Sequence, residues 1–301
     1  MNSKERQNYI GGTDVASIVL PRPKWKTKLA LWMEKTGKVI PPDISEKPEI
    51  EWGTLLEEVI RKKFIADTGY PVEKPQEPLV HPLYDYMQGH PDGIGVDENG
   101  NKFIFEAKTS RYGAGWEDGN IPEEYQLQVA YYMMLADVPY SFIAILIGGN
   151  DYRCFKIARD YELEKIIIEK IVDFWENNIL KDVAPELTAI DDFNLTLTEQ
   201  VPDVIEGNHE IDMLVNVYKD LQDKEKDISK EKEDVKLKIL EYMGNHEYLK
   251  AGRYIVRYQK VKSSTLDTKK LKNELPHIAE KYLRETESFR FTLKEDKNEE
   301  Y

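Results

Sequence analysis

The sequence predicts an α/β domain in which helices flank a mixed central sheet, followed by a charged C-terminal extension. Two apolar runs around an Asn-Gly turn at 86–109 have the pattern of a β-hairpin, and a second pair of β-rich runs follows at 140–157. Amphipathic helical segments precede, separate and follow these strands, an order typical of an α/β sandwich. From about residue 186 the chain becomes highly charged and helix-forming, which indicates a separate region.

Composition limits the class of protein. A chain of 301 residues can form one large domain or a domain with an appendage. It has no apolar run long enough to cross a bilayer and no signal peptide, so we expect a cytoplasmic protein with no membrane partner. The single cysteine, Cys154, excludes an intrachain disulfide and a multi-cysteine zinc or iron–sulfur site, and we expect it in the core of a strand.

The charge distribution is uneven. The net charge of −14 argues against a protein that coats nucleic acid non-specifically. Residues 1–40, however, contain eight lysines and arginines against three acidic residues, a local net charge of +5. A local basic region and bound divalent metal ions could carry phosphate contacts, so the overall charge leaves a nuclease possible.

The N-terminal segment predicts two helices joined by a basic loop. Two glycines followed by Thr13 predict a helix N-cap, which is either an anion site or an ordinary capped helix. The loop 21–28 places Trp25 among lysines, a composition that suits a DNA backbone or an unstacked base but also any solvated loop. A helix then runs from Leu29 until Gly37 stops it.

Residues 50–64 predict an amphipathic helix. With a step of about 100° per residue, Glu57 falls at the margin of the apolar face and Glu58 points into solvent. A carboxylate at such a margin is usually an ordinary surface residue. Lys63 falls within the apolar face and does not fit the pattern. The residues expected to share that face are Trp52, Leu55, Leu56, Val59, Ile60 and Phe64.

The hairpin at 86–109 carries the candidate chemistry. Asp92 lies in its first run, and the second run ends in Glu106 and Lys108. Residues two apart on a strand point to the same face. We therefore expect two sets of side chains on opposite faces: Ile104, Glu106 and Lys108 on one, and Phe103, Phe105 and Ala107 on the other.

These residue types suit metal-assisted phosphoryl transfer. Asp92 and Glu106 offer the hard oxygen ligands that Mg²⁺ prefers. Lys108 would hold or deprotonate the attacking water and screen the scissile phosphate. The alternative is a chance pattern, because a third of the residues are charged. The apolar strand favours a functional site, since a charged pair there is costly unless it is solvated or paired.

A glycine-rich, aromatic segment at 110–120 is expected to be a mobile loop beside this site, and Pro122 then suits the first turn of a helix. On that helix Tyr125, Gln128 and Tyr132 share one face. A core stripe of tyrosines and methionines would explain most of this face. Gln128 is harder to explain in that way, because a buried amide requires hydrogen-bond partners.

The rest of the chain predicts further strands and helices. Runs 140–147 and 152–157 form a second hairpin, and 160–180 form a packing helix. We expect a folded domain at 1–186, a linker at 187–206 and a helical and small α+β extension at 207–301.

Within the extension, residues 207–243 predict a helical hairpin or a long arm with a narrow packed stripe, because the heptad pattern is too thin for a coiled coil. Pro276 should break or kink the helix that contains it. The other expected elements are a hairpin at 248–259, a helix at 267–283, a strand at 289–293 and an acidic tail at 295–301.

Four motifs in the right order resemble the YqaJ-type viral recombinase, or lambda-exonuclease-like, branch of the PD-(D/E)XK nucleases. The resemblance covers roughly residues 6–180. Thr13 replaces the serine more common in the family, and Glu58 stands where the family often has proline. The motifs are Ile10-Gly-Gly-Thr13-Asp, the helix with Glu57, His90-Pro-Asp92-Gly with Glu106-Ala-Lys108-Thr, and Pro122-x-x-Tyr-x-x-Gln128-Val-x-x-Tyr132-Met.

The resemblance implies a restriction-endonuclease-like core and a role for each matching residue. It places Mg²⁺, for which Mn²⁺ would substitute, between Asp92, Glu106 and the Ala107 carbonyl, with Glu57 supporting the site. Lys108 would orient the attacking water. The resemblance also implies that Gln128 and Tyr132 line the cleft, and that Arg6 and Thr13 bind the 5′-terminal phosphate of DNA.

The implied activity is a 5′→3′ exonuclease on linear double-stranded DNA ends that leaves 3′ single-stranded tails for phage-type recombination. The resemblance further implies a homo-oligomer, a trimeric ring, a single-strand annealing protein as partner, and a phage or prophage protein acting in the bacterial host cell. One alternative is an endonuclease of the same fold, against which the Arg6 and Thr13 motif argues. Another is a catalytically silent DNA-binding or assembly protein that uses 207–301, against which the intact Asp92, Glu106 and Lys108 argue.

Overall fold

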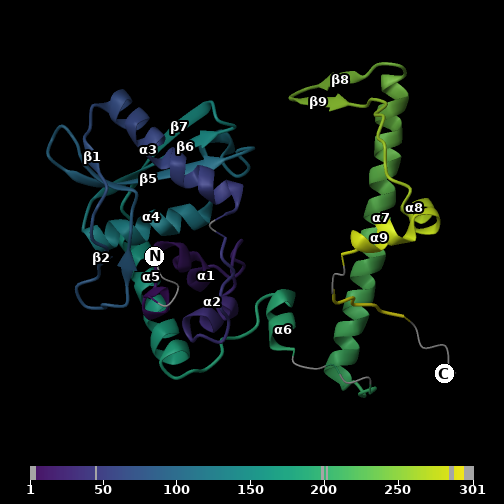
Figure 1. The fold of residues 1–301 in the computed structure, drawn as a ribbon, viewed down its shortest axis with the longest axis horizontal. Coiled ribbons are helices and arrows are strands. Elements are labelled where there is room, and N and C mark those ends of the chain that lie inside the picture. Colours follow the sequence, from purple (N-terminus) through teal and green to yellow (C-terminus); the bar gives the residue numbers. More distant parts are fainter. Residues whose placement is uncertain (1–4, 45, 198–199, 201–202, 285–287, 295–301) are drawn as a thin grey trace. The chain divides into compact units, whose positions relative to one another are not determined.

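The computed structural model describes residues 5–44, 46–197, 200, 203–284 and 288–294. The chain divides into two units, 1–198 and 199–301, which are described separately (Figure 1). Within the described residues, no helix combines the length and the apolar character needed to cross a membrane.

The first unit is built on a five-stranded sheet in the order β1-β4-β5-β6-β7. Strands β5 and β6 are parallel, and the other neighbours are antiparallel. This mixed sheet confirms the predicted architecture. The strands are β1 (Val72–Glu73), β4 (Gly93–Val96), β5 (Lys102–Ser110), β6 (Tyr140–Ile147) and β7 (Asp151–Ala158). A separate two-stranded sheet pairs β2 (Leu79–Val80) with β3 (Gln88–Gly89).

Helices cover both faces of the sheet. On one face α3 (Pro48–Thr68) inserts Ile60 and Phe64 against the aromatic side chains of β5. On the other face Ile104 packs into the largest core cluster, together with α4 (Glu123–Ala136). The two helices lie on either side of β5 (Figure 1). The other helices of this cluster are α1 (Val15–Val19), α2 (Lys28–Lys35) and α5 (Tyr161–Asp173), which a π-helical turn, Phe174–Ile179, extends.

Strand β5 confirms the predicted alternation. Phe103, Phe105 and Ala107 contact the α3 side, whereas Ile104 belongs to the α4 side. The preceding turn is closed by Asp97, whose carboxylate accepts hydrogen bonds from the backbone N–H groups of Asn99 and Asn101. The register of the hairpin is thereby fixed, and with it the face on which the charged residues of β5 project.

Helix α3 differs from its prediction. It is longer than the expected 50–64, and Trp52, Leu55 and Val59 are exposed instead of buried. Periodicity reports an apolar face but not what covers it, and here the core contacts come from the more C-terminal positions. Lys63 is also exposed and pairs with Asp67, which explains why it interrupted the expected stripe.

Two other predictions in the first unit are wrong. Cys154 is exposed, on β7 at the edge of the sheet. The range 187–206, expected to be a loop, contains the helix α6 (Ile190–Thr196). The buried Asp192 ties this helix to the rest of the unit by accepting a hydrogen bond from the Thr27 hydroxyl.

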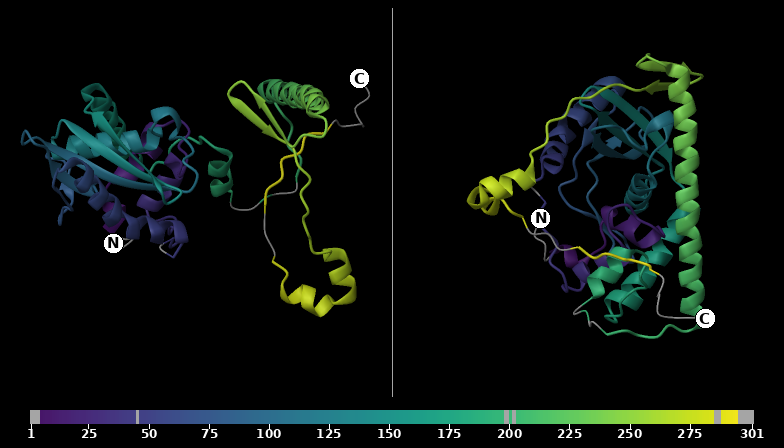
Figure 2. Two further views of the ribbon diagram at one scale, coloured as in Figure 1. Left: turned by 90° about the horizontal axis from the view of Figure 1, so that it is seen from above. Right: turned by 90° about the vertical axis from the view of Figure 1, so that its right-hand side faces the viewer.

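The second unit begins with α7 (His209–Met243), which Figure 2 shows as one uninterrupted helix. The predicted long arm is therefore confirmed, and the helical hairpin is wrong. The packed stripe predicted for the arm is also wrong, because its heptad positions are exposed: Leu214, Leu221, Ile228 and Val235. The predicted β-hairpin is confirmed, and the predicted helix is divided at Leu275, where Pro276 starts a new helix. Residues 289–293 are all described and none lies in a strand, so that prediction is wrong. These elements are β8 (Tyr248–Ala251), β9 (Tyr254–Arg257), α8 (Thr268–Glu274) and α9 (Pro276–Lys281).

The acidic tail 295–301 lies outside the described residues.

Candidate active site

The structure brings the three predicted catalytic residues together on the β4–β5 hairpin. Asp92 stands immediately before β4, and its Oδ2 accepts a hydrogen bond of 2.8 Å from the Ala107 N–H. On the neighbouring strand, Lys108 Nζ donates a hydrogen bond of 2.7 Å to Glu106 Oε1. The antiparallel register, which pairs Gly93 with Phe105, sets Asp92 beside Glu106 in the middle of β5.

The two carboxylates are held in an unfavourable environment. Glu106 is only 3% exposed, and its Oε2 is buried without a hydrogen-bond partner among the described residues. Burial and the repulsion of Glu106 raise the pKa of Asp92 to about 7. A second negative charge and an oxygen without a donor are costly inside a protein unless a cation compensates them.

Lys108 supplies part of that compensation. Burial alone would lower the pKa of Lys108, but the attraction of Glu106 and Asp92 outweighs it and raises the pKa above its ordinary value. The ammonium also lies 4.9 Å from the centroid of the Tyr125 ring. Lys108 is therefore a fixed cation, suited to holding a water or a phosphate oxygen and poorly suited to accepting a proton.

The donor set fits a hard divalent cation. Asp92 and Glu106 offer carboxylate oxygens, and the orphaned Glu106 Oε2 is an open ligand position. Within the described part of the chain, no three His, Cys, Asp or Glu residues are arranged to hold a metal ion. Two carboxylates with a backbone carbonyl and waters are nonetheless sufficient for Mg²⁺, which usually keeps several of its waters.

Glu57 lies near this site but is not one of its closest groups. Its negative charge is among those that raise the pKa of Asp92. Its carboxylate is paired with Lys74, with 3.0 Å between Oε2 and Nζ. Lys74, which holds Glu57 at the edge of the site, was not predicted from the sequence.

Helix α4 contributes the predicted pair of polar side chains. Gln128 and Tyr132 are both buried, and Gln128 Nε2 donates a hydrogen bond of 3.2 Å to Tyr132 Oη. Burial and the nearby charge of Glu106 raise the pKa of Tyr132, which keeps the hydroxyl neutral. Tyr132, which was predicted to share this helix face, is therefore the hydrogen-bond partner that the buried amide of Gln128 requires.

Two glycines make room for the Tyr132 ring. A Cβ atom at Gly12 would lie 2.5 Å from the ring, and one at Gly89 would lie 2.8 Å from it. Real Cβ atoms do not approach carbon so closely, so these positions allow the ring to pack directly on the backbone. Gly12, directly before Thr13, therefore shapes the site from the N-terminal side.

We expect Gly12→Ala to lower the free energy of unfolding by about 1–3 kcal/mol, because the added methyl forces the Tyr132 ring out of place. Urea denaturation would measure this loss. Gly11→Ala is the matched control, since its Cβ would meet Tyr9 at an ordinary 3.6 Å. Equal stability of the two variants would contradict this account of the packing.

Arg6 and Thr13 lie together at the surface. Arg6 Nη2 donates to Thr13 Oγ1 at 3.3 Å, and both residues are exposed. The predicted N-cap is wrong: Thr13 lies inside the 3-10 helix η2 (Gly12–Asp14), and the α1 helix follows this turn. The Asp14 carboxylate closes the turn by accepting a 3.1 Å hydrogen bond from the Gly11 N–H, which leaves the Thr13 hydroxyl pointing to Arg6.

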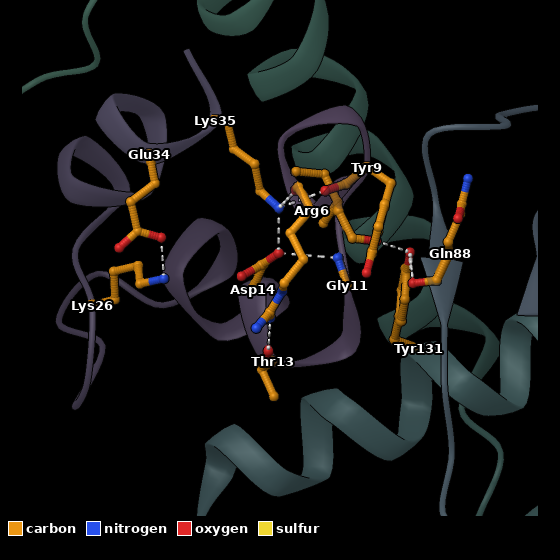
Figure 3. A network of polar contacts seen from close by, with 11 residues as sticks. Arg6, Tyr9, Gly11, Thr13, Asp14, Lys26, Glu34, Lys35, Gln88 and Tyr131 are labelled. Atoms are coloured by element: carbon orange, nitrogen blue, oxygen red, sulfur yellow. Dashed lines mark hydrogen bonds and ion pairs between the residues drawn. The ribbon is translucent and has the colours of Figure 1, made fainter. Parts of the chain in front are cut away.

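A buried lysine holds this N-terminal loop, as Figure 3 shows. Lys35 Nζ lies 2.8 Å from Asp14 Oδ2, and both side chains are 4% exposed. The same ammonium donates to the backbone carbonyls of Arg6 at 2.7 Å and Tyr9 at 2.5 Å. Burial would raise the pKa of Asp14, but the charge of Lys35 outweighs it and lowers the pKa.

The role of Lys35 was not predicted, because a lysine near the end of a helix carries no sequence signal of burial. On the opposite side of the loop, Tyr131 Oη donates to the carbonyl of Ile10 at 2.7 Å and to that of Gln88 at 3.2 Å. The loop that presents Arg6 and Thr13 is thereby fixed to both α2 and α4 (Figure 3).

Comparisons with known proteins identify the family of the chain. Residues 3–139 match the model of the YqaJ-like viral recombinase domain, a range that includes every predicted site residue. The uncharacterized protein YqaJ of Bacillus subtilis (strain 168) is 34% identical to this chain. The alignment covers 97% of this chain and 92% of that protein.

Solved structures show weaker likeness. The alkaline exonuclease LHK-Exo from Laribacter hongkongensis is 19% identical, with a TM-score of 0.46 over 59% of this chain and 92% of that chain. A phage related exonuclease from Haemophilus somnus 129PT is 16% identical, with a TM-score of 0.44 over 58% of this chain and 96% of that chain. The domain model matches residues 3–139, and YqaJ matches nearly the whole chain. The chain therefore belongs to the YqaJ-like viral recombinase family.

Proposed function

We propose that the protein is a Mg²⁺-dependent 5′→3′ exonuclease that digests linear double-stranded DNA and leaves 3′ single-stranded tails for recombination. The observation that carries this proposal is the cluster of the buried Glu106 with the partly buried Asp92 and Lys108, in which one oxygen of Glu106 has no donor among the described residues. Two carboxylates and an ammonium gathered on an otherwise apolar strand pair are more typical of a functional site than of a structural one. Membership of a viral recombinase family supports a role in DNA recombination.

The geometry supports a role for each residue of the site. Asp92, Glu106 and the Ala107 carbonyl would hold Mg²⁺ or Mn²⁺, which when bound lowers the pKa of a water and neutralises charge on the scissile phosphate. The Ala107 N–H keeps Asp92 in position. Lys108 stays protonated and orients the attacking water beside the phosphate. Glu57 adds negative charge at the edge of the site.

Gln128 and Tyr132 would line the active site on the α4 side. Their mutual hydrogen bond fixes both side chains, and the raised pKa of Tyr132 keeps its hydroxyl available as a donor. A fixed neutral donor can position a phosphate oxygen without adding charge to the site.

Arg6 and Thr13 would bind the 5′-terminal phosphate. Their side chains already contact each other and are exposed, so a phosphate can accept hydrogen bonds from both. Arginine is well suited to this task because its planar guanidinium can donate two parallel hydrogen bonds to phosphate. Recognition of an end would make the enzyme an exonuclease and not an endonuclease.

We also propose that the protein forms a homo-oligomer, a trimeric ring, and acts with a single-strand annealing protein in the cytoplasm of a bacterial host. Light scattering of the purified protein would give the oligomeric state directly. A monomer at micromolar concentration would contradict the ring.

Digestion of a 5′-phosphorylated linear duplex beside a closed circle tests the activity. The reactions would contain Mg²⁺ or EDTA. We expect loss of the linear form only, and only with Mg²⁺. Cutting of the circle would instead support an endonuclease of the same fold, and absence of cutting of either substrate would contradict a nuclease.

Metal binding has a readout that does not depend on cleavage. Because a cation relieves the repulsion between Asp92 and Glu106, we expect Mg²⁺ at about a hundredfold above its dissociation constant to raise the melting temperature by roughly 5 °C or more. Asp92→Asn should abolish this rise. The exposed Asp85 provides the matched control, and Asp85→Asn should keep the full rise. An Asp92→Asn protein that responds to Mg²⁺ as the original does would remove Asp92 from the metal site.

A further inference from the structure

Trp25 is an exposed aromatic side chain connected to the catalytic lysine. It is 54% exposed, although it is among the largest apolar side chains of the first unit. Its ring centroid lies 5.3 Å from that of Tyr125, and the ring of Tyr125 lies in turn under the Lys108 ammonium. One aromatic ring therefore separates the solvent-exposed indole from the candidate active site.

The Tyr125 ring, which contacts Trp25, also packs against a buried tryptophan. Trp116, from the loop expected to be mobile, is only 2% exposed and packs 5.4 Å from Tyr125, centroid to centroid. The carbonyl of Trp116 accepts a 2.9 Å hydrogen bond from Arg153 on β7. Tyr125 is thus held between a buried tryptophan and Lys108, and it offers Trp25 a fixed surface.

The loop that carries Trp25 is also held at its C-terminal end. Lys26 forms an ion pair with Glu34 on α2 at 2.5 Å. The Thr27 side chain caps α2 by accepting a 3.1 Å hydrogen bond from the Ala30 N–H. The proline at position 23 restricts the backbone before it. The backbone on both sides of Trp25 is therefore restrained.

Positive charge accompanies this aromatic surface. Arg22 and Lys24 are exposed, and neither forms an ion pair with any described residue. Lys26, two positions on, is by contrast already neutralised by Glu34. An exposed aromatic ring next to cations without ion-pair partners is the composition of a site for single-stranded nucleic acid, where bases stack on aromatic rings and cations contact phosphates.

We propose that Trp25 stacks on an unpaired base of the DNA strand at the entrance of the active site, with Arg22 and Lys24 contacting its phosphates. This inference rests on the proposed function, because it assigns the surface to the DNA substrate. Stacking on a ring that adjoins Tyr125 would hold the strand at a fixed place relative to Lys108. Every base has a flat π face, so the contact would be independent of sequence.

The test measures binding without cleavage. A fluorescein-labelled single-stranded 12-mer would be titrated with the full-length protein in EDTA, over a series of salt concentrations. A second 12-mer containing 2-aminopurine reports stacking through its quenching. The variants would be Trp25→Ala, Trp25→Leu and Trp25→Phe, with Tyr161→Ala as the matched control, since Tyr161 is an exposed aromatic on α5.

We expect Trp25→Ala and Trp25→Leu to bind roughly tenfold to a hundredfold more weakly and to lose the 2-aminopurine quenching. Trp25→Phe should retain most of both, and Tyr161→Ala should retain all. Loss of stacking leaves the salt dependence of binding unchanged, whereas Lys24→Ala should lower the slope of log affinity against log salt by about 1.

Equal binding and quenching by Trp25→Leu and the original protein would overturn the proposal, and would leave a protein partner as the occupant of this surface. A weakened Trp25→Ala that also melts at a lower temperature would be assigned to folding, and Trp25→Leu, which keeps an apolar contact with Tyr125, then decides. Cleavage is measured separately with Mg²⁺, so absence of nuclease activity with intact stacking would reject the proposed function alone.

Discussion

Replacing Lys108 with alanine is expected to abolish DNA cleavage while the protein stays folded and still binds DNA. The ammonium is the fixed cation nearest to both carboxylates, and its raised pKa keeps it charged at neutral pH. Removing one preorganised electrostatic contact in an active site typically lowers the rate by about 10²- to 10³-fold. Loss of the water-orienting role should lower it further. Single-turnover digestion of a labelled linear duplex would measure the rate.

Lys102→Ala is the matched control for this experiment. Lys102 starts the same strand but is exposed at the opposite end, away from Asp92 and Glu106. Its replacement should leave the rate within about twofold of the original, since surface substitutions of this kind have small effects. Circular dichroism would verify the fold of both variants. A Lys108→Ala protein that digests DNA at the normal rate would refute the mechanism.

Replacing Lys35 with methionine is expected to lower the free energy of unfolding by about 3–5 kcal/mol. Asp14 would be left buried without its cation, and two backbone carbonyls would lose their donor. Urea denaturation would measure the loss. Lys38→Met is the matched control, because Lys38 pairs with the exposed Asp182 and such pairs contribute only about 0–1 kcal/mol.

A double variant separates charge from packing. If the loss comes from an uncompensated carboxylate, Lys35→Met combined with Asp14→Leu should be more stable than Lys35→Met alone, since it leaves no buried charge. A Lys35→Met protein as stable as Lys38→Met would show that the network in Figure 3 contributes little to the fold.

The sequence predicted the parts of the site that depend on local pattern. The Asn-Gly turn fixes the hairpin register, so alternation along β5 correctly placed Glu106 and Lys108 on one face. The spacing on α4 correctly joined Gln128 to Tyr132. Such features follow from backbone geometry alone and need no knowledge of distant contacts.

Features that depend on tertiary contacts were not predictable in this way. Thr13 looks like an N-cap in sequence, but the Asp14 side chain closes the turn in its place. The apolar positions of α3 indicate a face without indicating how far the sheet covers it, so Trp52 was wrongly expected to be buried. Lys35 carries no signal at all, because its partners lie more than twenty residues earlier in the chain.

The most direct test of the central claim follows both strands at both ends of one linear duplex. One end carries a 5′-phosphate and the other a 5′-hydroxyl, and fluorophores of different colour mark the terminal nucleotides of each strand. With Mg²⁺ we expect the first nucleotides to be released from the strand whose 5′ terminus carries the phosphate, starting at that terminus. Arg6→Ala combined with Thr13→Val should remove the preference for phosphate. Three results would contradict a metal-dependent 5′→3′ exonuclease: release that starts at a 3′ terminus, the appearance of internal fragments, or release of nucleotides in EDTA.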